Sequence, residues 1–68
     1  MIKSHLSRLL GERKLKIADV ARATGLSRKA ITLLYQETGT RIEFETLDRL
    51  CEYLDCDVGD LLQRIPSN

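Results

Sequence analysis

The fold is decided by residues 17–36, which read Ile17-Ala18-Asp19-Val20-Ala21-Arg22-Ala23-Thr24-Gly25-Leu26-Ser27-Arg28-Lys29-Ala30-Ile31-Thr32-Leu33-Leu34-Tyr35-Gln36. Each half of this stretch places apolar residues at i, i+3 and i+4, which is one face of a helix. Gly25 follows the first pattern, where a helix ends most easily in the left-handed conformation. Ser27 precedes the second pattern and can accept a hydrogen bond from its first turn. The stretch therefore predicts helices over 17–24 and 28–36, joined by a tight turn.

Two helices joined in this way form a helix-turn-helix, whose second helix enters the major groove of DNA. The stretch resembles the motif of the Cro/phage-repressor family of bacterial regulators, which has alanine at its fifth position, glycine at its ninth and a branched apolar residue at its fifteenth. Ala21, Gly25 and Ile31 occupy those positions here. Residues 44–62 are similar to the last two helices of the same family. The resemblance covers almost the whole chain and implies an all-α, compact, lambda-repressor-like bundle of about five short helices that binds DNA.

Length and composition agree with one small helical domain over residues 1–68. The chain has 68 residues with one Phe, two Tyr and no Trp, so the core must consist mainly of Leu, Ile, Val and Ala. No apolar run approaches the ~20 residues of a membrane span, and the first residues lack the layout of a signal peptide. We therefore expect a cytoplasmic protein without a membrane partner.

Three further helices are expected outside the central stretch. Residues 2–13 carry an apolar stripe with charged residues mostly elsewhere, which predicts an amphipathic first helix. After a polar loop, Ile42 and Phe44 are expected to return to the core. A fourth helix is expected over 44–54, and a short fifth helix over 58–64.

The start of the helix over 17–24 departs from the family pattern. Relatives usually have a capping Ser or Thr where Lys16 stands, and a lysine cannot accept the capping hydrogen bond, which predicts a helix start weaker by ~1 kcal/mol. Asp19 in the first turn partly compensates by facing the positive end of the helix dipole. Lys16 can also replace, with its own charge, a family side chain that contacts the DNA backbone.

Charge is distributed unevenly although the net charge is only +1. Residues 1–41 contain nine basic and three acidic residues, whereas residues 42–68 contain two basic and seven acidic ones. A basic half that carries the helix-turn-helix suits phosphate, and an acidic half turned away would orient the protein on DNA. Ordinary solvated charge is the alternative explanation.

The outward face of the helix over 28–36 is expected to read base edges. Arginine and lysine can donate to guanine O6 and N7, glutamine carries the donor and acceptor that adenine needs, and threonine can bond to a base or present its methyl group. Leu33 either contacts a thymine methyl group or is simply an exposed leucine. The expected base-contacting residues are Arg28, Lys29, Thr32, Leu33 and Gln36.

A second set of side chains is expected to position the protein on the phosphates. Ser27 acts together with the free N–H groups of the helix that follows it, and the others lie on the flanks. For Tyr35, a phosphate contact and simple packing are both compatible with the pattern. The expected phosphate-contacting residues are Lys16, Arg22, Ser27, Tyr35, Thr38, Thr40 and Arg41.

A homodimer is expected because one such domain reads only a few base pairs, and two copies on a two-fold site supply the usual affinity. A short final helix cannot readily bury four apolar side chains against its own small core, although closing that core is the alternative role for them. The expected interface residues are Val58, Leu61, Leu62 and Ile65.

Other classes of function have weaker support. The single histidine has no partner at a catalytic spacing and no glycine-rich phosphate loop is present, so we expect neither an enzyme nor a cofactor or small-molecule ligand. Cys51 and Cys56 are not spaced as zinc ligands, and no metal is expected. The leading hypothesis is a sequence-specific regulator, a small repressor acting on an inverted-repeat operator. The alternative is an antitoxin-like interaction module whose acidic half, residues 42–68, binds a partner protein.

Overall fold

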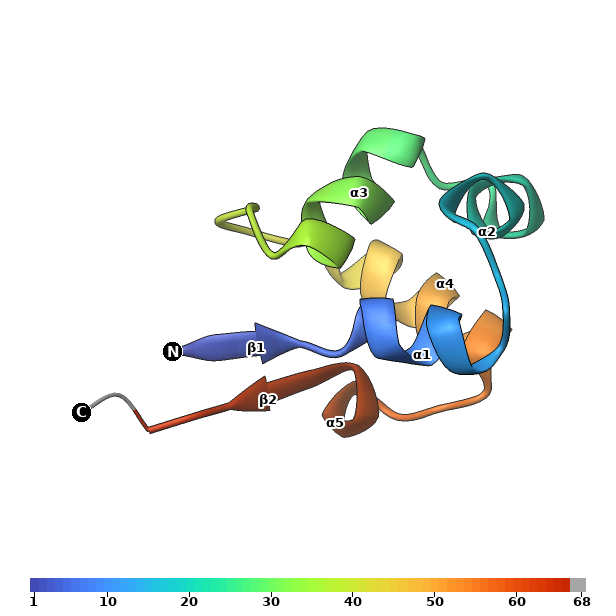
Figure 1. Cartoon of the computed structure of the whole chain (residues 1–68). Helices are drawn as coiled ribbons and strands as arrows, with labels where there is room; N and C mark the ends of the chain where they lie inside the picture. Colours follow the sequence, from blue (N-terminus) through green and yellow to red (C-terminus); the bar gives the residue numbers. More distant parts are fainter. Residues whose placement is uncertain (67–68) are drawn as a thin grey trace.

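A computed structural model describes residues 1–66 as a small helical bundle with a two-stranded ribbon at one end (Figure 1). Three helices, α2, α3 and α4, occupy the ranges expected from their apolar spacing. The elements in chain order are β1 (Ile2–Ser4), α1 (Leu6–Glu12), α2 (Ile17–Thr24), α3 (Arg28–Gln36), α4 (Phe44–Leu54), α5 (Val58–Leu61) and β2 (Leu62–Arg64).

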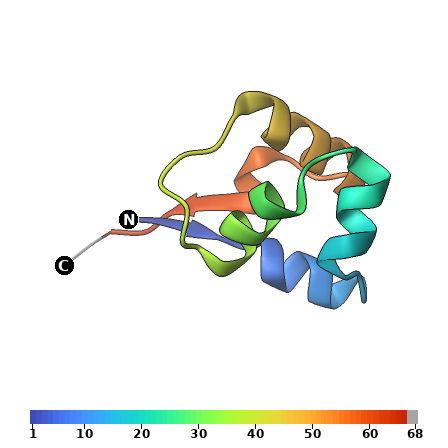
Figure 2. The ribbon, with the colours of Figure 1, turned by 90° about the horizontal axis from the view of Figure 1, so that it is seen from above.

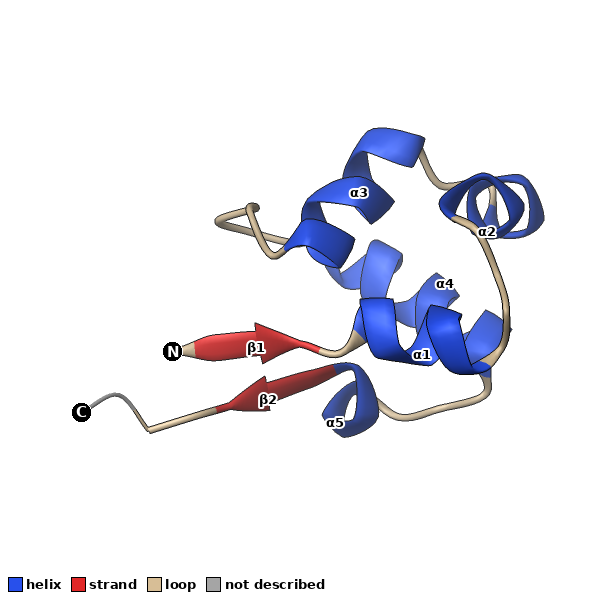
Figure 3. Cartoon of the chain, viewed as in Figure 1, coloured by secondary structure: helices blue, strands red, loops and turns tan. Residues whose placement is uncertain are grey.

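The expectation of an all-α fold with a first helix over 2–13 is wrong at its beginning. Residues Ile2–Ser4 form β1, which pairs antiparallel with β2 in the register Ile2↔Arg64, Lys3↔Gln63 and Ser4↔Leu62 (Figure 3). The Ser4 side chain explains where the helix starts, because its Oγ accepts a hydrogen bond from Leu6 N–H at 3.2 Å. This side chain satisfies a first-turn donor that would otherwise be free.

The expected final helix over 58–64 also ends early. α5 stops at Leu61, and Leu62 adopts an extended backbone with φ −127° and ψ 143°. The carbonyl of Leu61 accepts a hydrogen bond from His5 N–H at 2.8 Å, so the chain leaves the helix to run beside β1. Leu61 itself is fully buried. It closes the core of its own chain and has no surface to offer to a dimer interface.

The core lies between the helices, and its buried apolar side chains within residues 1–66 are all aliphatic, as the composition predicted. Its buried members are Leu6, Leu9, Leu10, Val20, Ile31, Leu47, Leu50, Leu54 and Leu61. The helix ends are also tied together, since Arg13 Nη2 donates to the carbonyl of Leu54 at 2.7 Å. Among residues 1–66, no helix is long and apolar enough to cross a membrane.

Phe44 does not return to the core. Ile42 packs against the core, but Phe44, the first residue of α4, leaves 88% of its surface exposed. The helix positions its core-facing residues, Leu47, Leu50 and Leu54, on another side of α4. The connection between α3 and α4 passes over the ribbon, as the view from above shows (Figure 2).

Candidate nucleic-acid interface

The turn between α2 and α3 has the geometry that the sequence predicted. Gly25 adopts φ 77° and its N–H donates to the carbonyl of Ala21 at 2.9 Å. Thr24 Oγ1 donates to the carbonyl of Val20 at 2.7 Å and accepts from Leu26 N–H at 3.2 Å. These bonds fix the direction in which the chain enters α3.

The start of α3 is capped by Ser27. Its Oγ accepts a hydrogen bond from Ala30 N–H at 3.1 Å. The N–H groups of the preceding positions in the first turn have no intrahelical partner, because an α-helix always leaves its first donors free. Ser27, Arg28 and Lys29 are exposed at this end, so an anion such as a phosphate can approach those donors.

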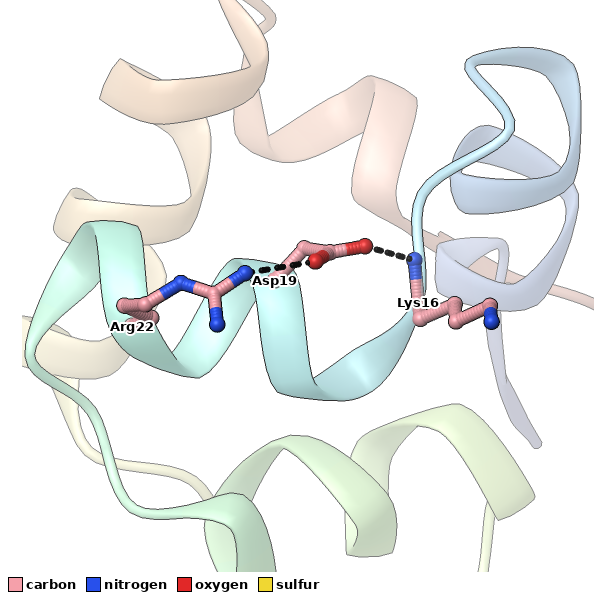
Figure 4. A network of polar contacts seen from close by, with 3 residues as sticks. All are labelled: Lys16, Asp19 and Arg22. Carbon is pink, nitrogen blue, oxygen red and sulfur yellow. Dashed lines mark hydrogen bonds and ion pairs between the residues drawn. The ribbon is translucent and has the colours of Figure 1, made fainter.

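The start of α2 is held by one carboxylate that accepts from both sides (Figure 4). Asp19 Oδ2 accepts from the backbone N–H of Lys16 at 3.0 Å, and Asp19 Oδ1 accepts from Arg22 Nη2 at 2.8 Å. The Lys16 side chain does not cap the helix, as its chemistry predicted, and its ammonium group remains free to meet a phosphate. The Arg22 side chain is 76% exposed, so its pair with Asp19 is weak and can be exchanged for a phosphate.

A shallow hollow of about 520 Å³ separates the start of α2 from the outward face of α3. Lys16 lines it from the position just before α2, and Arg28, Thr32 and Tyr35 line it from α3. The structure therefore brings together four of the residues singled out in the sequence, two for bases and two for phosphates. Lys29 and Gln36 are exposed on the same helix, and Thr38, Thr40 and Arg41 are exposed in the connection that follows.

Leu33 lies apart from that hollow. Its side chain lines a different, apolar groove on the other side of α3, close to Gly39. A methyl group added to Gly39 would approach Leu33 Cβ to 3.2 Å, so a larger residue at Gly39 would crowd Leu33.

The charges of the site are largely unneutralised. Within residues 1–66, the ion pairs are Arg8–Glu12, Arg22–Asp19 and Arg49–Glu45, which leaves Lys16, Arg28, Lys29 and Arg41 without an acidic partner. Such side chains keep their full potential for phosphate or base acceptors. In contrast, five carboxylates gather at α4 and α5, and α5 lies on the far side of the bundle from α3 (Figure 1).

The two free cysteines belong to that acidic region. Both are partly buried, and the N–H of Cys56 donates to the carbonyl of Cys51 at 3.0 Å across the end of α4. Burial raises the pKa of the Cys51 thiol above its ordinary value, and Cys56, Asp57 and Asp48 raise it further. No group of three or more metal-binding side chains occurs in the part of the chain that the structure describes.

Sequence reasoning missed one residue that shapes the surroundings of the site. Glu37 follows α3 in the left-handed conformation with φ 59°, and its Oε1 accepts from Ser4 N–H at 3.0 Å. The bond ties the end of α3 to the edge of β1. No sequence pattern could have revealed it, because the partners are 33 residues apart.

Comparison with known proteins agrees with a helix-turn-helix domain that binds DNA. Residues 5–67 match the model of the Cro/C1-type HTH DNA-binding domain. The chain is 26% identical over 55 residues to an uncharacterized HTH-type transcriptional regulator, YozG, of Bacillus subtilis (strain 168). That match covers 81% of this chain and 66% of the relative, just under two thirds of its length. The crystal structure of the transcriptional regulator VanUg is similar with a TM-score of 0.77 and 27% identity, over 97% of this chain and 87% of that one.

Proposed function

This chain belongs to the Cro/C1-type HTH DNA-binding family, and from that premise we propose that it is a sequence-specific transcriptional regulator of double-stranded DNA. We propose more narrowly that it is a small repressor, which occupies an inverted-repeat operator through α3 and excludes polymerase. The observation that carries the proposal is the hollow that Lys16, just before α2, lines together with Arg28 and Thr32 of α3.

The roles within this interface follow from the position of each side chain. Arg28, Lys29, Thr32 and Gln36 are the proposed base-reading residues, because they lie along the outward face of α3. Leu33 remains a proposed base contact, but it lies at the edge of the base-reading face, since its side chain lines the neighbouring groove. The proposed phosphate contacts surround that face and are Lys16, Arg22, Ser27, Tyr35, Thr38, Thr40 and Arg41.

We propose that residues 1–68 act as one domain and that two copies bind together. One recognition helix reads only a few base pairs, and a two-fold pair of helices one turn of DNA apart reads an inverted repeat. Of the apolar residues expected at the interface, Val58, Leu62 and Ile65 retain exposed surface, whereas Leu61 does not.

An in vitro selection tests the proposal directly. Random duplex DNA is selected on the purified protein at physiological salt and sequenced. An enriched inverted repeat is the expected result and gives the half-site spacing. An enriched single half-site would keep the regulator and remove the two-fold dimer, whereas no enrichment would contradict sequence-specific binding.

The acidic region favours a second candidate function. Asp48, Glu52, Asp55, Asp57 and Asp60 surround one hollow at α4 and α5, away from α3. An antitoxin-like module would use such a surface to bind a basic partner protein while its helix-turn-helix binds DNA. A copurifying protein that protects residues 42–66 from hydrogen exchange would support this alternative.

A further inference from the structure

We propose that the apolar groove at the ribbon end binds a second copy of this chain, and that Phe44 of each copy fills the groove of the other. The inference deepens the proposed function, because a two-fold regulator needs a contact that fixes its two recognition helices. It locates that contact around Phe44 rather than around α5.

The groove is formed by three parts of the chain. Its floor is one face of the ribbon, where Ile2 and Leu62 alternate with polar neighbours along their strands. Its wall is the inner side of α3, and its rim is the connection from α3 to α4. The groove has a volume of about 600 Å³, and its apolar lining consists of Ile2, Ala30, Leu33, Leu34, Ile42 and Leu62.

Phe44 is the exposed apolar side chain that we expect to fill the groove of a second copy. It is 88% exposed although it belongs to a regular helix, and its neighbour Glu43 lines the groove. An aromatic side chain contributes strongly to association when it enters an apolar pocket. Phe44 therefore directly follows a residue of the groove and is left uncovered by its own chain, so a partner molecule can cover it.

An exposed apolar residue such as Phe44 next to an apolar groove suits a contact between two copies related by a two-fold axis. When the axis passes between the two features, each copy inserts its Phe44 into the other at the same time. The charges around the groove suit such a pairing, since Arg64 and Glu43 both line it and neither forms an ion pair within residues 1–66. Under a two-fold axis, Arg64 of one copy can therefore meet Glu43 of the other.

A stable interface covers about 800 Å² on each partner, so the contact must also cover the surface around the groove. Met1, at 69% exposed, extends the apolar area of Ile2 beyond the groove. The contact leaves Arg28 and Thr32 open to DNA, because they lie on the other side of α3.

The oligomeric state of two matched variants tests the proposal. Phe44→Ala and Tyr53→Ala each shorten an exposed aromatic residue of α4, and alanine suits both positions. We expect Phe44→Ala to weaken the dimer at least about tenfold, and Tyr53→Ala to leave it nearly unchanged, as measured by sedimentation with and without inverted-repeat DNA. The proposal is overturned if the unchanged chain is monomeric in both conditions, or if Phe44→Ala remains as dimeric as the unchanged chain.

A photocrosslinking residue at position 44 identifies what occupies the groove. The expected product is a covalent dimer in which the adduct lies on Leu33, Ile42 or Leu62 of the second copy. An adduct on α5, on another protein or on a small molecule would overturn the proposal.

Failure of this inference differs from failure of the proposed function. A chain that forms dimers through Phe44 but selects no DNA sequence would contradict the function and retain the groove contact. A monomeric chain that selects a single half-site would contradict the groove contact and retain the DNA-binding function.

Discussion

At the scale of single residues, Arg28 is the side chain best placed to read a base. It stands at the first position of α3, is exposed, and forms no ion pair within the described chain. Its guanidinium can bond to guanine O6 and N7 with two parallel hydrogen bonds. A neighbouring acid would compete for that group, and none does so here.

Replacing Arg28 therefore tests direct readout. Arg28→Ala is expected to weaken specific binding by ~1–3 kcal/mol and to relax one base position, which repeated selection and fluorescence anisotropy would reveal. Arg8→Ala is the matched control, because Arg8 is also exposed but is paired with Glu12 on α1. An equal loss of affinity on all sequences would reassign Arg28 to a phosphate.

Cys51 offers a second residue-scale prediction. Its raised pKa favours the neutral thiol in the folded state, so alkylation at neutral pH should be slower than in the unfolded chain. The same shift contributes stability below the pKa of the unfolded thiol, and that contribution is lost as pH rises through the folded pKa. Alkylation rates of the Cys56→Ser variant, followed from neutral pH to above 9.0, give the profile of Cys51 alone. Equal rates in folded and unfolded chains at neutral pH would contradict the prediction.

At the scale of elements, two requirements oppose each other at the start of α2: capping the helix and binding a phosphate. Asp19 satisfies the backbone of Lys16, but the position that usually caps the helix holds a lysine. A better cap would stabilise the helix, whereas the lysine ammonium suits a phosphate. We therefore infer that this position favours binding over stability.

Lys16→Ser should separate those requirements. The hydroxyl can cap the first turn, so the free energy of unfolding in urea should rise by ~0.5–1 kcal/mol. Affinity should fall alike on all sequences, with the salt slope reduced by about 1 for each copy. Lys16→Ala provides the comparison, since it should reproduce the loss of binding without the gain in stability. Unchanged affinity in both variants would remove Lys16 from the interface.

The sequence predicted the elements whose cause is local and missed those whose cause is distant. α2, α3 and the Gly25 turn follow from spacing and caps within a few residues. The strand β1 forms only by pairing with β2, about sixty residues later in the chain. Its apolar residue, Ile2, also fits the apolar stripe expected for the first helix, so the sequence pattern does not reveal the strand. Phe44 is expected to return to the core after the polar loop, and only the packing of α4 shows that it faces solvent. The contacts between the site residues and DNA remain predictions.

At the scale of the whole molecule, the two signs of charge occupy different sides. Unpaired basic residues surround α2 and α3, whereas the carboxylates gather at α4 and α5. A distribution of this kind orients the protein as it approaches a polyanion, even though the net charge is only +1.

Binding should consequently depend strongly on salt. Lys16, Arg22 and Arg41 are the basic phosphate candidates, which gives six such contacts in a dimer. Affinity is then expected to fall by roughly 10³ between about 50 and 200 mM salt. Titrations of labelled operator DNA at several salt concentrations measure this slope, and a flat response would argue against binding through phosphates.

The ribbon formed by β1 and β2 also has a consequence for the order of folding. It closes a loop of nearly the whole chain, and such distant contacts carry the largest closure entropy and form late. The helices can assemble first, because their contacts are more local. Since the ribbon is the floor of the groove, a newly made chain should complete its helical bundle before it can dimerise. Dimerisation would then be limited to chains in which β1 and β2 have already paired.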